Sequence, residues 1–305
     1  MSPSALACPA SLKGVLAAHD AAEALCEGLG AGSVPLPVAD GGEGTLDVLH
    51  VALGGQWRVA DVVDAFGQPR RARWLSLPDG TAALEAAEAI PLDPSRLDAA
   101  AASSRGLGEL IAAVGSPTRL LVGLGGVATT DGGAGLGLDA LPAPTEVLCD
   151  VRVALLDAAR LFAPQKGASP GQVEELVARL AAMEELAPYA ELPGAGAAGG
   201  LGARFAALGG ELVRGADRLL ELIGLRERLR DASFVVTGEG TVDRTTAAGK
   251  APGSVARLAR EAGVRCVVFG GRVVEPLKGV ETVALSGDRS RARDDLVELG
   301  RRLGQ

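Results

Sequence analysis

Short hydrophobic runs alternate with amphipathic stretches at both ends of the chain. At the start, an apolar run at residues 5–8 is followed by an Ala- and Leu-rich stretch at 17–29 and a second apolar run at 34–38. This order predicts a strand, a helix and a strand. The other end repeats the pattern, with apolar runs at 233–236, 266–269 and 282–285 and helical stretches at 254–262 and 291–303. Strands that alternate with helices are typical of a parallel sheet, so both chain ends are expected to build an α/β fold.

The middle of the chain follows a different pattern. Apolar runs at residues 57–63, 72–77 and 81–84 predict a strand meander, with a turn at the Pro-Asp-Gly sequence of residues 78–80. Helical patterns follow at 107–114 and 173–185. This change of pattern predicts a second domain inserted into the first. The cleft between the two domains is the expected active site, because ligand pockets favour domain interfaces and the carboxyl ends of parallel strands.

Composition and charge exclude several classes of partner. The chain has 305 residues, a hydrophobic fraction of 48% and a net charge of −8. Without a block of basic residues, this charge argues against a nucleic-acid partner. No apolar run reaches the roughly 18–20 residues that span a bilayer, and no leader pattern opens the chain. We therefore expect a cytoplasmic protein with no membrane partner.

Few residue types are available for catalysis. The four cysteines lack CxxC spacing, which argues against a zinc site and a disulfide framework. His19 and His50 are the only histidines, so carboxylates and lysines are expected to do the chemistry. Lysine is rare among the basic residues, yet Lys13, Lys166 and Lys250 lie in Gly-rich or Pro-Gly-bounded motifs. There an ammonium group suits phosphate binding, although each could equally be a solvated surface lysine.

The first Gly-rich motif, Ala-Asp-Gly-Gly-Glu-Gly-Thr at residues 39–45, follows the predicted strand at 34–38. Gly41 and Gly42 leave backbone N–H groups that can bind an anion. Asp40 and Glu43 could hold Mg²⁺ or a substrate hydroxyl. The alternative interpretation is a tight turn between a strand and a helix.

A second Gly-rich motif covers residues 123–135, directly after a predicted strand at 119–122. A passage of this kind from strand to helix is typical of a phosphate or carboxylate cradle. Thr129 and Thr130 would be hydroxyl donors and Asp131 a metal or hydroxyl partner. The glycines assigned to the cradle are Gly125, Gly126, Gly132 and Gly133. The motif matches neither a P-loop nor a GxGxxG dinucleotide fingerprint.

Two further motifs carry carboxylates next to lysines. Asp150 follows an apolar run and is well placed as a general base, while Lys166 could offset charge on a transferring phosphoryl group. A helix cap and a solvated turn residue are the alternatives. The last motif, at residues 236–252, suits a metal-bridged phosphate site with Lys250 at a helix N-terminus. Its other candidate residues are Gly238, Glu239, Gly240 and Asp243.

The Gly-rich run at residues 192–202 has no charge and can contribute only backbone. With it, five motifs stand in one order, and they resemble those of the type I glycerate kinase family: ADGGEGT, GxGGxATxDGGAG, CDV followed by FxPQKGA, LPGAGAAGGLG and TGEGxxDxxTxxGKxP. The resemblance spans nearly the whole chain. It implies phosphorylation of D-glycerate by ATP with Mg²⁺, usually to 2-phosphoglycerate.

The resemblance also implies a fold, and the motifs themselves give our hypothesis for the roles of their residues. A flavodoxin-like (Rossmann-type) domain is expected from residues 1–58 and 233–305, with a mixed α/β domain inserted at 59–232. Asp150 or Asp131 would be the base, and Lys250 its electrophilic partner. The metal ligands would be Asp40, Glu43, Glu239 and Asp243. The remaining candidates, Lys13, Lys166, the threonines and the glycines, would bind phosphate or carboxylate, and a homodimer is kept as a hypothesis.

The chain departs from the family pattern in several places. Ala10 stands where the N-terminal motif has a carboxylate, and the segment between Asp139 and Glu146 is short. Thr130 and Val153 stand where the family pattern has asparagine, and Thr245 stands where it has glutamine. The replaced carboxylate supports an alternative function, a catalytically weakened paralogue that binds nucleotide or a hydroxy acid and regulates a partner. A dehydrogenase is disfavoured, because the glycines lack the fingerprint with its acidic residue about 20 positions on.

Overall fold

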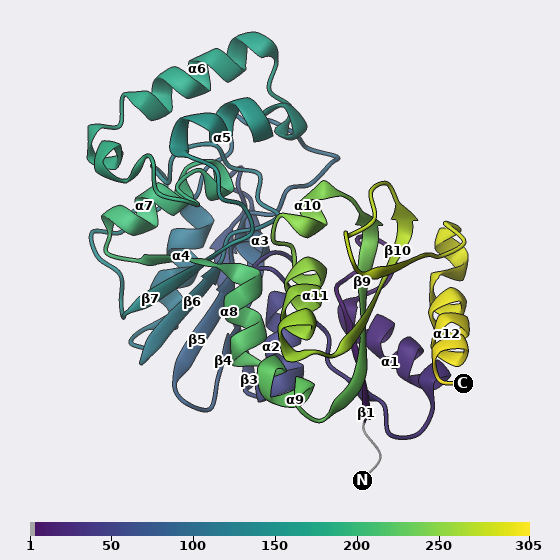
Figure 1. The fold of residues 1–305 in the computed structure, drawn as a ribbon. Coiled ribbons are helices and arrows are strands. Elements are labelled where there is room, and N and C mark those ends of the chain that lie inside the picture. Colours follow the sequence, from purple (N-terminus) through teal and green to yellow (C-terminus); the bar gives the residue numbers. More distant parts are fainter. Residues whose placement is uncertain (1–3) are drawn as a thin grey trace. The chain divides into compact units, whose positions relative to one another are not determined.

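The computed structural model describes residues 4–305, and this part of the chain forms two compact units (Figure 1). The first unit holds the residues up to Asp40, Asp47–Ala52 and Ala216–Gln305. The second holds Gly41–Leu46 and Leu53–Gly215. The domain boundaries expected from the sequence, after residue 58 and after residue 232, stay a prediction about independent folding.

A five-stranded sheet forms the centre of the first unit, and all its strands are parallel. Taken in chain order within this unit, the strands lie in the order 2-1-3-4-5, which is the order of flavodoxin-like folds. The predicted flavodoxin-like domain built from both chain ends is therefore confirmed. Its strands are β1 (Ser4–Pro9), β2 (Val34–Pro35), β9 (Ala232–Val242), β10 (Arg265–Val273) and β11 (Glu281–Ala284).

Helices from the two ends of the chain pack against each other in this unit (Figure 1, purple and yellow). Glycines allow α1 (Ala18–Leu29) and α12 (Ala292–Leu303) to approach closely, since a Cβ on Gly28 would lie 2.1 Å from the Val297 carbonyl oxygen. Side chains from the helices and the sheet, including Leu25, Phe269 and Leu296, fill the core between them. The other helices are α2 (Thr45–Leu53, mostly in this unit), α8 (Gly215–Leu222), α9 (Leu225–Leu229), α10 (Arg244–Ala247), α11 (Ala251–Ala262) and the 3₁₀ turn η4 (Arg289–Arg291).

Three strands of this sheet differ from the pattern-based expectation, and one of them, β10, runs to Val273 instead of ending at residue 269. β2 is short, although hydrogen bonds from the Leu36 and Val38 amides to the β1 carbonyls continue the parallel pairing. β9 runs to Val242 instead of ending at residue 236. The strand predicted from the apolar run at 233–236 was too short, because backbone pairing with β10 continues through the polar and glycine residues.

The second unit is built on a mixed sheet with the order β3-β4-β5-β6-β7-β8. β3 (Gln56–Val63), β4 (Pro69–Ser76) and β5 (Thr81–Glu85) form the predicted antiparallel meander. β6 (Arg119–Gly123), β7 (Thr145–Cys149) and β8 (Glu211–Arg214) continue it in parallel with β5. The carboxyl ends of four strands therefore meet at one edge of this sheet.

Helices and 3₁₀ turns complete the second unit. They are α3 (Ala86–Ala89), α4 (Arg105–Val114), α5 (Leu155–Phe162), η1 (Pro164–Lys166), α6 (Pro170–Ala181), η2 (Glu184–Tyr189), η3 (Ala197–Gly199) and α7 (Leu201–Ala207). The helix expected at 173–185 starts earlier, because Ser169 and Gln172 form a capping box. It also ends earlier, at Ala181, where the chain passes into η2 with Pro188.

Candidate active site

Loops after the parallel strands of the second unit come together with the first Gly-rich motif. The Gly125 amide donates a hydrogen bond of 3.1 Å to the Gly41 carbonyl oxygen. The Leu46 amide, in the first turn of α2, donates one of 2.8 Å to Oε1 of Glu85, at the end of β5. Residues 41–46 are thus held over the carboxyl ends of β5 and β6.

Glycine is required where these loops touch. Gly41 has a positive φ of 99°, and a Cβ there would lie 2.7 Å from the Leu148 carbonyl oxygen. A Cβ on Gly125 would lie 2.5 Å from Cα of Gly42 and 3.3 Å from Oδ2 of Asp150. The glycines of the two motifs therefore let three backbone segments and the Asp150 carboxylate approach one another closely.

Asp150 and Lys166 form the charged part of this region. Asp150 follows β7 directly and is exposed. Lys166 is only 4% exposed, and its Nζ donates a hydrogen bond of 2.6 Å to the Thr129 carbonyl oxygen. Burial lowers the pKa of Lys166 to about 8, and the charges of Asp150 and Asp131 act in the opposite direction. The structure thus brings together a solvent-accessible carboxylate and a buried ammonium group with a lowered pKa.

Asp131 has a different environment from Asp150. It is buried, and its Oδ2 accepts hydrogen bonds of 2.8 Å from both the amide and the hydroxyl of Ser104. The amides of Gly133 and Gly135 also donate to this carboxylate. Gly132 and Gly133 have positive φ angles, so the carboxylate fixes a left-handed turn. Its acceptor sites are engaged in holding the loop.

The threonines next to Asp131 are fully buried. The Thr129 hydroxyl lies 3.3 Å from the Ala198 carbonyl oxygen, to which it donates. The Thr130 hydroxyl has no hydrogen-bond partner among the described residues. Gly126 has a positive φ of 76° and space around it, since its Cβ would meet only the Ala87 side chain at 3.6 Å.

The first unit holds the last motif. Glu239 is buried in β9, and its two carboxylate oxygens accept hydrogen bonds from the Thr246 hydroxyl at 2.6 Å and from Nζ of Lys250 at 3.0 Å. Burial raises the pKa of Glu239, the nearby Asp40 charge adds to the rise, and the two hydrogen bonds oppose it. Lys250 is the N-cap residue of α11, as expected from the sequence.

Other candidates of the first unit have structural roles or lie at its surface. Asp243 is the N-cap of α10, where it accepts from the Thr245 amide. Gly238 allows close strand packing, because its Cβ would lie 2.2 Å from the Phe269 carbonyl oxygen. Gly240 faces the backbone of Lys13, whose side chain is exposed. Glu43, in the second unit, is exposed as well.

Comparison with known proteins decides the family. The model of the "Glycerate kinase family" matches residues 5–144 and 138–287. The glycerate 2-kinase of Escherichia coli K12 is 35% identical over 308 residues, covering 83% of this chain and 81% of that protein. The glycerate kinase of Bacillus subtilis 168 is also 35% identical, over 322 residues, covering 87% and 84%. The chain belongs to the glycerate kinase family.

A solved structure supports this family and the fold. The crystal structure of a proposed glycerate kinase 2 from Salmonella typhimurium LT2 superimposes with a TM-score of 0.83 and 28% sequence identity. It covers 100% of this chain and 98% of that one. The predictions of the family, of a kinase and of a two-part α/β fold are confirmed. No helix in residues 4–305 is long and apolar enough to cross a membrane.

A kinase of this family uses small-molecule substrates and ATP, and the carboxylates can be tested as ligands for a metal ion. Residues 4–305 contain no group of three or more His, Cys, Asp or Glu side chains that could surround a cation. Mg²⁺ in kinases, however, is usually held by one or two carboxylates together with substrate phosphates and water. The charges of Asp40 and Glu239 interact within the first unit. Both oxygens of Glu239 already accept hydrogen bonds, so Glu239 would have to exchange its contact with Thr246 or Lys250 to bind the ion.

Glu85 is a residue of this kinase that sequence reasoning missed. It is only 5% exposed and holds the N-terminal turn of α2 through the Leu46 amide. The sequence could have predicted the location of Glu85, because this residue directly follows the predicted strand at 81–84, as Asp150 follows β7. The pairing with a residue 39 positions earlier was not, because no local pattern specifies it.

Proposed function

We propose that the protein transfers the γ-phosphoryl group of ATP to D-glycerate and forms 2-phosphoglycerate in preference to 3-phosphoglycerate. The exposed Asp150 carboxylate beside the buried Lys166 ammonium is the observation that carries this proposal. A hydroxyl group that attacks a phosphoryl group is helped by a carboxylate that accepts its proton, while a cation offsets the charge being transferred. The choice of the 2-hydroxyl is supported by the name of the Escherichia coli relative.

Asp150 is the preferred base, ahead of Asp131. A base must reach its substrate, and Asp150 is exposed whereas Asp131 is 7% exposed and accepts four hydrogen bonds. Asp131 would instead keep the loop with Thr129, Thr130, Gly132 and Gly133 in shape. The backbone of Gly41, Gly42, Gly125 and Gly126 would then be available for contacts with the acid or with phosphate.

The candidate residues of the first unit are proposed to bind the phosphate groups of ATP. Lys250, at the N-terminus of α11, would contact phosphate oxygens together with Gly238, Gly240 and Lys13. Asp40 and Glu239 would hold Mg²⁺, with Asp243 and Glu43 as weaker candidates. When bound, the ion would neutralise charge on the β- and γ-phosphates. A cytoplasmic location and a homodimer stay hypotheses for fractionation and light scattering to test.

The test is a coupled ADP-release assay with D-glycerate and Mg·ATP, followed by phosphorus NMR of the product. Asp150→Asn should lower kcat by about 100- to 10,000-fold, the usual contribution of a general base, with little change in KM. The exposed Asp139→Asn is the matched control and should keep full activity. Asp131→Asn should mainly lower stability, by about 1–3 kcal/mol, because a buried acceptor is lost. Normal turnover by Asp150→Asn would remove Asp150 as the base.

A regulatory paralogue is the second candidate, and Ala10 is the observation that favours it. Ala10 stands where the family pattern has a carboxylate, and its amide donates to the Gly238 carbonyl oxygen at 2.9 Å. Calorimetry that shows ATP or D-glycerate binding without turnover would support this function. Gain of activity in Ala10→Asp would show that the missing carboxylate is the cause.

A further inference from the structure

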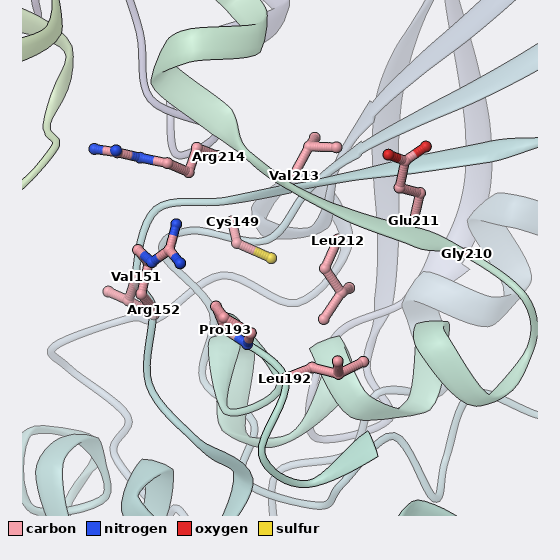
Figure 2. A pocket seen from close by; sticks show the side chains of 10 residues that line it. All are labelled: Cys149, Val151, Arg152, Leu192, Pro193, Gly210, Glu211, Leu212, Val213 and Arg214. Carbon is pink, nitrogen blue, oxygen red and sulfur yellow. The ribbon is translucent and has the colours of Figure 1, made fainter. Parts of the chain in front are cut away.

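A cavity of about 380 Å³ lies in the second unit, and none of the candidate residues above lines it. Its volume is within the range of about 300–1,000 Å³ that is typical of small-molecule pockets. Three segments form its walls: the residues after β7, the Leu192-Pro193 turn, and the whole stretch from Gly210 to Arg214 (Figure 2). A three-carbon acid is much smaller than this space, so the cavity suits a larger ligand.

One wall of the cavity is the edge strand of the sheet. β8 pairs with β7 on one side and is the last strand in the sheet order. Alternate residues of an edge strand direct their N–H and C=O groups away from the sheet. Five consecutive residues, Gly210 to Arg214, line the cavity, which is expected where a strand presents its backbone edge to a ligand. Such an edge matches a heterocycle that carries a donor next to an acceptor, as adenine does.

Apolar side chains form part of the remaining walls. Leu192 and Pro193 lie across the cavity from Leu212 in Figure 2, whereas the Val213 side chain projects to the other side of β8. Leu192 is 41% exposed, so its side chain is accessible to a ligand. Apolar side chains on either side of a cavity suit the faces of a flat ring, while the polar groups of the strand edge would form hydrogen bonds with the edge of that ring.

The charged residues at the ends of the cavity would orient a bound ligand. Arg152 and Val151 lie at one end, and Gly210 and Glu211 at the other (Figure 2). Arg152 is exposed and makes no ion pair or side-chain hydrogen bond within residues 4–305. It stands two positions after Asp150, the proposed base. A ligand with an anionic end would place that end at Arg152 and its uncharged end toward Gly210.

We propose that this cavity binds the adenine nucleotide donor, with the base against β8 and the Leu192-Pro193 turn and the phosphates at Arg152. The inference rests on the proposed function, because it assigns a site to the nucleotide that the kinase uses. It adds Arg152, Leu192 and the backbone of residues 210–213 to the binding residues.

The experiment measures ATP binding and turnover separately. Arg152→Ala should raise the calorimetric Kd and the KM for ATP about tenfold, since a charged hydrogen bond is lost, with the KM for D-glycerate nearly unchanged. Leu192→Glu should raise both ATP constants as well. Arg71→Ala removes an exposed arginine on β4 of the same unit and is the matched control. Photolabelling with 8-azido-ATP should modify residues 192–193 or 210–214.

The outcomes separate this inference from the proposed function. Turnover with unchanged ATP constants in both variants and labelling elsewhere would overturn the pocket and leave the kinase activity intact. A higher KM for D-glycerate alone would assign the cavity to the acid instead. ATP binding that weakens in Arg152→Ala, in a protein that does not phosphorylate D-glycerate, would support the pocket and refute the proposed acceptor. No ATP binding by the unaltered protein would overturn both.

Discussion

Lys166 has almost no access to solvent, yet it keeps an ammonium group next to two carboxylates. Burial lowers its pKa to about 8, so Lys166 changes charge within the range of ordinary assays. A phosphate or carboxylate bound near Lys166 would favour the charged form. The free enzyme should therefore lose substrate affinity as the pH rises through about 8, while the complex loses it only at higher pH.

We expect kcat/KM for D-glycerate to fall above about pH 8 with a single ionisation, and kcat to fall only at higher pH. The reason is that kcat/KM reports the free enzyme, whereas kcat reports the complex with substrate. Lys166→Arg should remove this ionisation if the variant folds. The free energy of unfolding should instead rise with pH in this range. The pKa of Lys166 in the folded state lies below the ordinary 10.5, so folding favours the neutral form of the side chain. The cost of burying the charge should thus decrease between pH 8 and 10.5. A flat kcat/KM profile up to pH 9.5 would contradict the assignment.

The loops after the strands are the elements on which the candidate site depends. In the loop after β6, a Cβ on Gly125 would meet both Gly42 and the Asp150 carboxylate. The arrangement leaves no space for a single added carbon, because Cα of Gly42 lies 2.5 Å from where it would be. Replacement must move either the 41–46 segment or Asp150.

Gly125→Ala should therefore lower kcat at least tenfold and reduce the free energy of unfolding by about 1–3 kcal/mol, as overpacking usually does. The control is Gly171→Ala in the first turn of α6, where no atom lies within 4 Å and φ is not positive. That variant should keep its activity and unfold at the same or a slightly higher urea concentration. Full turnover by Gly125→Ala would show that the contact does not support catalysis.

Elements with a clear hydrophobic period were predictable, and those fixed by distant backbone contacts were not. The strands of the meander and the buried centre of β10 follow from apolar runs that must be buried. β9 was cut short in the prediction because Gly238 and Glu239 look like loop residues, although pairing with β10 satisfies their backbone. In the site, the position of Asp150 was predictable from the strand before it. The Ser104 donors of Asp131, 27 residues away, were not.

Each of the two units has hydrophobic core residues of its own. Leu25, Phe269 and Leu296 belong to the core of the first unit, and Leu107, Leu110 and Phe205 to that of the second. The two tryptophans of the chain, Trp57 and Trp74, lie in β3 and β4 of the second unit. Tryptophan fluorescence therefore reports the second unit, whereas far-ultraviolet circular dichroism reports both.

These probes test whether the predicted domains unfold separately, as chains of this size with several domains often do. Leu25→Ala removes a fully buried side chain of α1 and should cost about 2–5 kcal/mol, because it leaves a cavity. We expect it to shift the dichroism transition in urea and to leave the fluorescence midpoint unchanged. The reciprocal variant, Leu110→Ala in α4, should shift the fluorescence midpoint. If Leu25→Ala moved both midpoints equally, the chain would unfold as one cooperative body, and two independently folding domains would be the wrong description.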